Sequence, residues 1–171
     1  MSGASSAAVD GLHIVRAGPA HVPALLALYR DAGITGEHDY DVAAGQAQLA
    51  RLDAYPFYRL FVASKDGQLV GTYEFLEMEN MAKAGAKTAI VEDVAVATRA
   101  QKAGVGRALM EHARALATAR GCYKLMLSSN LRRQGAHAFY DALGFARHGY
   151  SFRLDLPGPS AGWPAARSAR E

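Results

Sequence analysis

The chain has 171 residues, half of them apolar and a fifth charged, which is an ordinary composition for a domain with a core of its own. The formal charge of +3 is too small to indicate a nucleic-acid surface, and a single cysteine excludes an intramolecular disulfide. No apolar run has the length of a membrane span, no secretory signal pattern opens the chain, and no His-Glu-x-x-His or Cys/His cluster supports a metal site. We therefore expect a cytoplasmic protein with no metal and no nucleic-acid or membrane partner.

In the first half of the chain, hydrophobic periodicity predicts a short strand, two helices and two strands joined as a hairpin. These elements are expected at residues 13–16, 18–31, 41–52, 58–64 and 68–76. The hairpin turn is predicted at Lys65-Asp66-Gly67, because Asp-Gly between two apolar runs favours a tight turn. Residues 80–87 are small and polar and predict a loop beside the substrate entrance.

The second half predicts a strand, a helix, another strand, a short helix and two closing strands. These are expected at residues 88–97, 104–119, 123–128, 136–143, from 145 and at 150–156. In the last of these strands, four apolar side chains alternate onto one face, namely those of Tyr150, Phe152, Leu154 and Leu156. That face is available to pair in a homodimer.

The two ends of the chain are small, polar or rich in proline and glycine. Residues 1–10 and 157–171 are therefore expected to be disordered, which leaves one domain at residues 11–156. Trp163 is an exception in the tail and docks either on a partner or on the body of the protein.

A glycine turn joins the strand at 88–97 to the helix that follows it. The turn reads Gln101-x-x-Gly104-x-Gly106, and it places backbone N–H groups at a helix N-terminus, where they can hold phosphate. Gly104 and Gly106 also lack the Cβ atoms that would keep a diphosphate from the backbone. The turn matches neither the dinucleotide fingerprint nor the P-loop, and the alternative is a strand-to-helix turn with no ligand.

Four segments, taken in order, carry a likeness to a known family. They are residues 92–96, 101–107, 121–124 and 138–145. Together they resemble the GCN5-related N-acetyltransferases (GNAT), which use acetyl-coenzyme A. The resemblance extends over residues 58–156, and more loosely from residue 12. It implies an α/β (α+β) fold with a mixed, mostly antiparallel central sheet flanked by helices, in which the strands at 88–97 and 123–128 splay apart to hold the cofactor.

The resemblance also implies how acetyl-coenzyme A is held. The backbone of Val94, Ala95 and Val96 should hydrogen-bond the pantetheine arm like an added strand. The N–H groups from Lys102 to Arg107 should hold the pyrophosphate, and the side chains of these two residues either add charge there or are solvated. The expected cofactor-binding residues are Val94, Ala95, Val96, Gln101, Lys102, Ala103, Gly104, Val105, Gly106, Arg107, Asn130 and Tyr140.

Two residues are expected to carry the chemistry. A protonated amine cannot attack a thioester, and Glu92 is the expected base, although it is alternatively a structural carboxylate paired across the sheet. Asp93 should face the opposite side of an ideal strand. The resemblance implies that Tyr140 protonates the leaving sulfur; the alternative is that it packs in the core. Asn130 either binds the pantetheine or caps the next turn.

Acetyl transfer is expected to be direct, because the lone Cys122 sits in a position typical of a small buried hydrophobe rather than a nucleophile. The expected acceptor is an amine of a small molecule, such as a polyamine, an amino sugar, an aminoglycoside or an amino acid. The alternatives are a protein N-terminus or lysine, or a binding module that senses coenzyme A without turnover.

The sequence does not identify the acceptor within that class. Segments 92–94 and 121–124 resemble glucosamine-phosphate acetyltransferases, yet the N-terminal half shows no clear sugar-phosphate clamp. Glu37, Asp39 and Asp41 either attract a cationic amine or belong to a solvated acidic loop.

Overall fold

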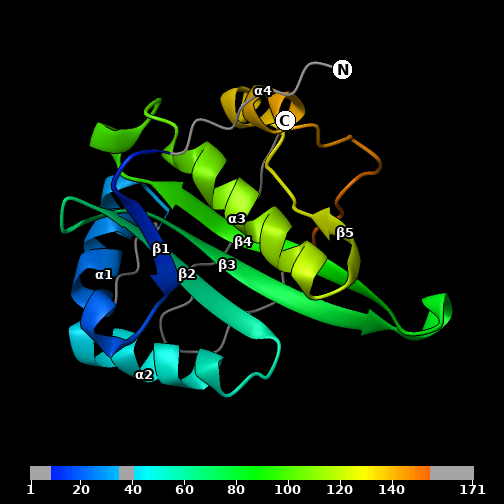
Figure 1. Cartoon of the computed structure of the whole chain (residues 1–171), viewed down its shortest axis with the longest axis horizontal. Helices are drawn as coiled ribbons and strands as arrows, with labels where there is room; N and C mark the ends of the chain where they lie inside the picture. Colours follow the sequence, from blue (N-terminus) through cyan, green and yellow to red (C-terminus); the bar gives the residue numbers. More distant parts are fainter. Residues whose placement is uncertain (1–8, 35–40, 155–171) are drawn as a thin grey trace. The chain divides into compact units, whose positions relative to one another are not determined.

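Five strands form one sheet in the order β1-β2-β3-β4-β5, in which every neighbouring pair is antiparallel except β4 and β5, which are parallel (Figure 1). The computed structural model describes residues 9–34 and 41–154. The strands are β1 (Leu12–Arg16), β2 (Tyr58–Lys65), β3 (Gln68–Asn80), β4 (Ala86–Val96) and β5 (Cys122–Met126). The predicted mixed, mostly antiparallel sheet is confirmed.

The described residues divide into a larger unit that ends at Leu127 and a smaller unit that begins at Ser128. The larger unit holds the sheet together with η1 (Pro19–His21), α1 (Val22–Asp31), α2 (Val42–Asp53), η2 (Met81–Lys83), η3 (Thr98–Ala100) and α3 (Val105–Ala119). The smaller unit holds α4 (Gln134–Ala142). At the start of α2, the Asp41 carboxylate accepts a hydrogen bond from the backbone N–H of Ala44 at 2.7 Å, so this predicted acidic residue serves as a helix cap.

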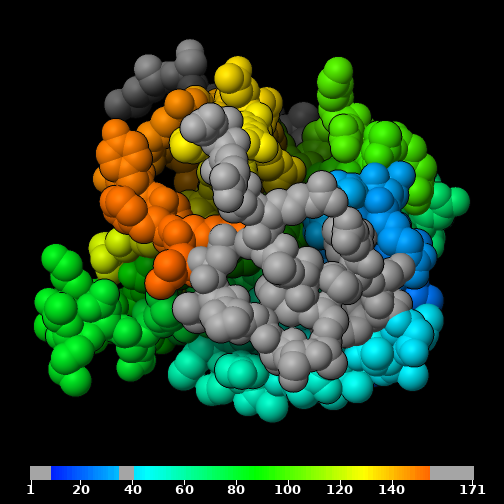
Figure 2. Space-filling view, turned by 180° about the vertical axis from the view of Figure 1, so that it is seen from behind, coloured from blue at the N-terminus to red at the C-terminus, as the bar shows by residue number. Residues whose placement is uncertain are grey.

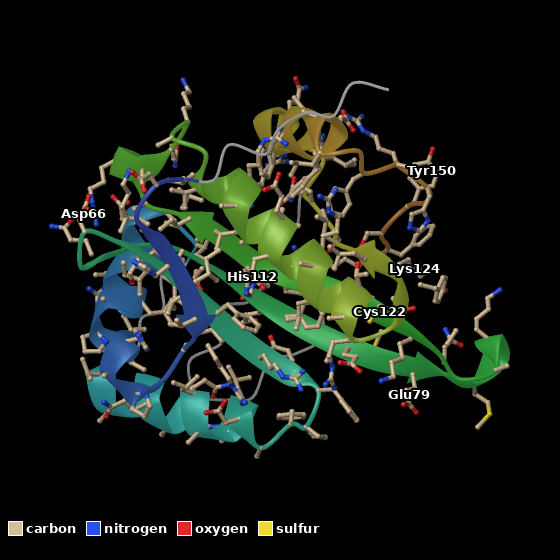
Figure 3. All side chains as sticks on the ribbon, viewed as in Figure 1. Asp66, Glu79, His112, Cys122, Lys124 and Tyr150 are labelled. Atoms are coloured by element: carbon tan, nitrogen blue, oxygen red, sulfur yellow. The ribbon has the colours of Figure 1, made fainter. Side chains whose placement is uncertain are left out.

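Side chains alternate along β2 and divide between the two faces of the sheet. Leu60 and Val62 are buried in a core formed with α1 and α2. Phe61, between them, stacks on Tyr73 of β3 with ring centroids 5.1 Å apart, and its ring also meets His112 of α3 at 5.1 Å. Figure 3 shows His112 directed from α3 toward the sheet. Helices α1 and α2 therefore cover one face and α3 covers the other, as period-2 strands require.

The predicted hairpin forms, and β3 and β4 form a second one that was not predicted. Asp66 and Gly67 form the two-residue turn between β2 and β3 with φ of 51° and 73°, as the Asp-Gly pair predicts. The loop expected at 80–87 is shorter, because β3 continues to Asn80 and pairs Glu79 with Lys87 of β4. The Lys87 ammonium lies 3.0 Å from the Glu77 carboxylate, and this cross-strand contact of opposite charges favours the extended ladder. The tip of the hairpin, green in Figure 2, is open to solvent, and Met81 there is 96 % exposed.

The predicted closing strands at 145–146 and 150–156 are wrong for the part of the chain that the structure describes. Residues 145–154 form no strand, and Tyr150, Phe152 and Leu154 are exposed. An alternating apolar pattern makes a strand only where a neighbour completes its ladder, and no described strand pairs with this segment. Residues 155–156, Trp163, Glu37 and Asp39 lie outside the described residues.

Candidate active site

Strands β4 and β5 separate halfway along β4. Their pairing begins at Lys87 and Cys122 and ends at Ile90 and Met126, whereas β4 continues to Val96. Beyond Ile90, the edge of β4 that faces away from β3 has no strand partner among the described residues. The predicted splaying of these strands is thus confirmed, and it leaves an open backbone edge.

The open edge presents two of the three backbone positions expected to bind pantetheine. The N–H of Ala97 donates to Val70 of β3 at 2.9 Å, and Ala95 lies opposite Thr72 of β3. Because backbone groups alternate in direction along a strand, Val94 and Val96 face the open edge. An extended ligand arm can hydrogen-bond these two residues as a strand would.

A bulge interrupts β4 beside this edge. The register passes from Ala95 opposite Thr72 to Glu92 opposite Glu74, which leaves Asp93 and Val94 against one residue of β3. Asp93 has a left-handed φ of 47°, a conformation that costs a non-glycine residue about 1 kcal/mol. The expectation that Asp93 lies on the face opposite Glu92 assumed an unbroken strand, and the bulge removes that assumption.

The glycine turn supplies backbone donors at the N-terminus of α3. Lys102 and Gly104 have left-handed φ values of 61° and 84°, and Gly104 is the N-cap of the helix. The N–H groups of residues 102–107 have no hydrogen-bond acceptor within the described chain. Such unpaired amides, together with the helix dipole, form a site suited to a phosphate anion.

Side chains on either side of the turn fix its ends. The Gln101 amide donates weakly to the Val96 carbonyl at 3.5 Å, and Val105 is buried beneath the turn. Lys102 is exposed. The Arg107 guanidinium lies 3.8 Å from the Glu111 carboxylate and its side chain is 49 % exposed, so part of its charge is neutralised within α3.

Three carboxylates gather at the bulge. Glu92 lies directly opposite Glu74 in the register of β3 and β4, and the Tyr58 hydroxyl donates a hydrogen bond to Glu74. Burial and the neighbouring Asp93 raise the pKa of Glu92. Burial raises the pKa of Glu74 as well. The hydrogen bond from Tyr58 lowers this pKa and the neighbouring Asp93 and Glu92 raise it, and the net change is a rise. A carboxylate with a raised pKa is better matched to accept a proton from an ammonium group.

Sequence reasoning did not identify Glu74, Tyr58 or Tyr29 as members of this group. Burial raises the pKa of the Tyr29 hydroxyl on α1, and Glu74 and Asp93 raise it further. Tyr29 therefore interacts electrostatically with both carboxylates. A signal for Glu74 was present in the sequence, since it is a charged residue between the apolar Tyr73 and Phe75 of a predicted strand.

Tyr140 and Asn130 belong to the smaller unit. The Tyr140 ring, half-buried, lies 5.1 Å from Phe139 and 5.8 Å from Phe145 between centroids. The Asn130 side-chain oxygen accepts from the backbone N–H of Arg132 at 2.9 Å, which is the turn-capping role that was one of its two predicted alternatives. These contacts describe the smaller unit alone, so the functions expected of the two residues stay predictions.

Cys122 begins β5 and is half-buried rather than fully buried. Burial raises the pKa of its thiol, with a further rise from Glu77, and this disfavours the thiolate that a nucleophile needs. Within residues 9–34 and 41–154, no group of three or more His, Cys, Asp or Glu side chains is placed to hold a metal ion. None of the described helices is long and apolar enough to cross a membrane.

Comparison with known proteins agrees with this geometry. The family model described as the acetyltransferase (GNAT) family matches residues 22–145. Over 98 residues the chain is 31 % identical to a glucosamine 6-phosphate N-acetyltransferase of Trypanosoma brucei brucei, a match that covers 57 % of this chain and 65 % of that protein.

Solved structures resemble the chain over most of its length. The structure named "Putative acetyltransferase from Agrobacterium tumefaciens str. C58" is 29 % identical, with a TM-score of 0.79 over 84 % of this chain and 99 % of that one. The aminoglycoside acetyltransferase meta-AAC0020, from an uncultured soil metagenomic sample, shares the fold at 20 % identity, with a TM-score of 0.74 over 88 % of this chain and 100 % of that one. The chain belongs to the GNAT family of acetyltransferases, enzymes that use acetyl-coenzyme A as the acetyl donor.

Proposed function

We propose that this protein transfers the acetyl group of acetyl-coenzyme A directly to an amine of a small molecule. The observation that carries the proposal is the presence of two sets of available backbone groups on the same segment of chain, one at the open edge of β4 and one in the turn at 102–107. A pantetheine arm fits the edge at Val94 and Val96, and a pyrophosphate fits the amides of the turn. The names of the Trypanosoma relative and of meta-AAC0020 support a small-molecule amine as acceptor.

The chemistry assigns one proton to each of two residues. Glu92 takes a proton from the acceptor's ammonium group, and the free amine then attacks the thioester carbonyl. As the carbon–sulfur bond breaks, the coenzyme A sulfur leaves with the bonding pair, and the Tyr140 hydroxyl gives it a proton. The new amide nitrogen then loses its second proton, which restores the Tyr140 hydroxyl. The half-buried Cys122, with its raised pKa, supports direct transfer over an acetyl-cysteine intermediate.

A calorimetric experiment tests the cofactor site. Gly106→Trp places a large side chain at the start of α3, and we expect it to abolish acetyl-coenzyme A binding. Ala82→Trp, at the exposed tip of the β3–β4 hairpin, is the control for added bulk and should bind normally. Unaltered affinity in Gly106→Trp would exclude the turn as the pyrophosphate site.

Turnover is tested by following free thiol release from acetyl-coenzyme A across a panel of small amines. Tyr140→Phe should slow release at saturating acetyl-coenzyme A, and full activity in that variant would remove Tyr140 as the acid. If the protein binds acetyl-coenzyme A but acetylates no amine or peptide, it acts as a coenzyme A sensor. A cytoplasmic location and a homodimer remain predictions, to be checked by cell fractionation and light scattering.

A further inference from the structure

We propose that Glu74 is a specificity-determining residue that selects an acceptor with two or more ammonium groups. The inference rests on the proposed function, because it concerns the acceptor side of the same reaction. It identifies the substrate class as a diamine or polyamine.

The placement of Glu74 follows from the sheet. Its neighbours Tyr73 and Phe75 are fully buried, and the Tyr73 hydroxyl lies 2.6 Å from Nδ1 of His112 on α3. Alternation therefore turns Glu74 toward the face that α1 and α2 cover. It is cross-strand neighbour to Glu92, the proposed base, and its carboxylate is held by the Tyr58 hydroxyl. A ligand amine at Glu92 is thus one cross-strand pair away from Glu74.

No described cation compensates this charge. Glu74, Glu92 and Asp93 form no ion pair with any Lys, Arg or His of the described chain. Glu74 is half-buried, whereas Glu92 and Asp93 are exposed. A half-buried carboxylate without a counter-charge is destabilising unless a ligand brings one. A separate observation places a ligand here, since the open edge of β4 ends at the same bulge.

The reaction itself separates acceptors with one ammonium from those with two. A monoamine gives its proton to Glu92 and becomes a neutral amide, so that nothing positive remains beside Glu74. A diamine keeps its second ammonium through the reaction, and Glu74 can hold it by a charge-assisted hydrogen bond. Glucosamine 6-phosphate, named for the Trypanosoma relative, would bring a phosphate dianion toward three carboxylates, an arrangement of like charges that disfavours binding.

The test compares 1,4-diaminobutane with butylamine, which has the same chain and one ammonium fewer. We expect the wild type to have a higher kcat/KM for the diamine than for butylamine. Glu74→Gln should lower kcat/KM for the diamine by about tenfold or more and change kcat/KM for butylamine by less than about twofold. Tyr58→Phe, which leaves Glu74 without its donor, should reduce the same preference. Glu79→Gln removes an equal charge from an exposed position on the same strand and should leave both values unchanged (Figure 3).

Three outcomes would overturn the inference while leaving the proposed function in place. They are equal use of both amines by the wild type, faster thiol release with glucosamine 6-phosphate than with the diamine, and equal losses for both amines in Glu74→Gln. Calorimetry of 1,4-diaminobutane with protein saturated with coenzyme A needs no turnover. Diamine binding that Glu74→Gln weakens at least tenfold would support the inference, even if no amine were acetylated. A failure to acetylate any amine would then count against the proposed function alone. Diamine binding that the variant leaves unchanged would overturn the inference.

Discussion

Glu77 is the most informative residue to change for stability. Its side chain is 1 % exposed and meets three cations from three different elements. The Arg120 Nε at the end of α3 lies 2.7 Å from the carboxylate, Lys87 Nζ of β4 lies at 3.0 Å, and an Arg59 nitrogen of β2 lies at 4.0 Å. We predict that Glu77→Gln strongly destabilises the fold, because it leaves these cations together without a counter-charge.

The magnitude follows from burial. Removing one partner of a fully buried ion pair costs about 3–5 kcal/mol of unfolding free energy. The three cations are 20 %, 30 % and 38 % exposed at their side chains, so each can turn partly to water and reduce the loss. We therefore expect a decrease of about 2–3 kcal/mol, which lowers the urea midpoint by about 1 M.

Urea unfolding of the wild type and of Glu77→Gln, at neutral pH and under acid conditions, measures the effect. Burial raises the pKa of Glu77, but hydrogen bonds from Arg120 and Lys87 outweigh it, and the net pKa lies below the ordinary 4.5. The stabilisation is therefore complete above pH 4.5 and is lost as the pH falls below it. Glu79→Gln, two residues along β3 and exposed, is the control. A loss under about 1 kcal/mol in Glu77→Gln would refute this reasoning.

Three further predictions concern the site and the core. Because Glu92 must be ionised to accept a proton and its pKa is raised, Glu92→Gln should remove the acid limb of the pH–rate profile, and an unchanged profile would exclude it as the base. Lys102 has φ of 61°, so the unfolding free energy of Lys102→Gly should exceed that of Lys102→Ala by about 1 kcal/mol. Equal urea midpoints for the two variants would argue against the left-handed turn. Burial lowers the pKa of His112, so the unfolding free energy should fall as the pH drops below 6.5, and a wild-type pH dependence in His112→Gln would contradict this.

Much of the fold could be predicted from local pattern. The period-2 runs of β2 and β3 and the Asp66-Gly67 turn are short-range signals, and each lies within a residue or a few of its expected place. The errors concern long-range pairing. The β3–β4 ladder continues through polar residues, where Lys87 of β4 reaches the buried Glu77 of β3, whereas the alternating segment at 150–154 has no described neighbour to pair with.

The residues of the candidate site also differ in whether local sequence or long-range pairing determines them. The turn at 101–106 could be predicted because left-handed backbone selects glycine locally, at Gly104. The bulge at Asp93 could not, because it appears only when β4 is aligned against β3. Glu74 could be identified only from its register with Glu92 and from the hydrogen bond that it accepts from Tyr58, which is 16 positions away in the sequence. The proposed cofactor turn is thus encoded in consecutive residues, whereas the proposed acceptor site depends on tertiary structure.

Glu74 and Glu77 lie three residues apart on β3, so they point to opposite faces of the sheet, and the fold treats them differently. Glu77 receives cations from β2, β4 and α3, whereas Glu74 receives one hydroxyl and two neighbouring carboxylates. Because the folded state raises the pKa of Glu74, its ionised form opposes folding at neutral pH, and Glu74→Gln should raise the urea midpoint as surely as Glu77→Gln lowers it. A residue whose loss stabilises the protein but impairs its selectivity serves function at the expense of stability. A lower midpoint in Glu74→Gln would instead make its carboxylate a structural group.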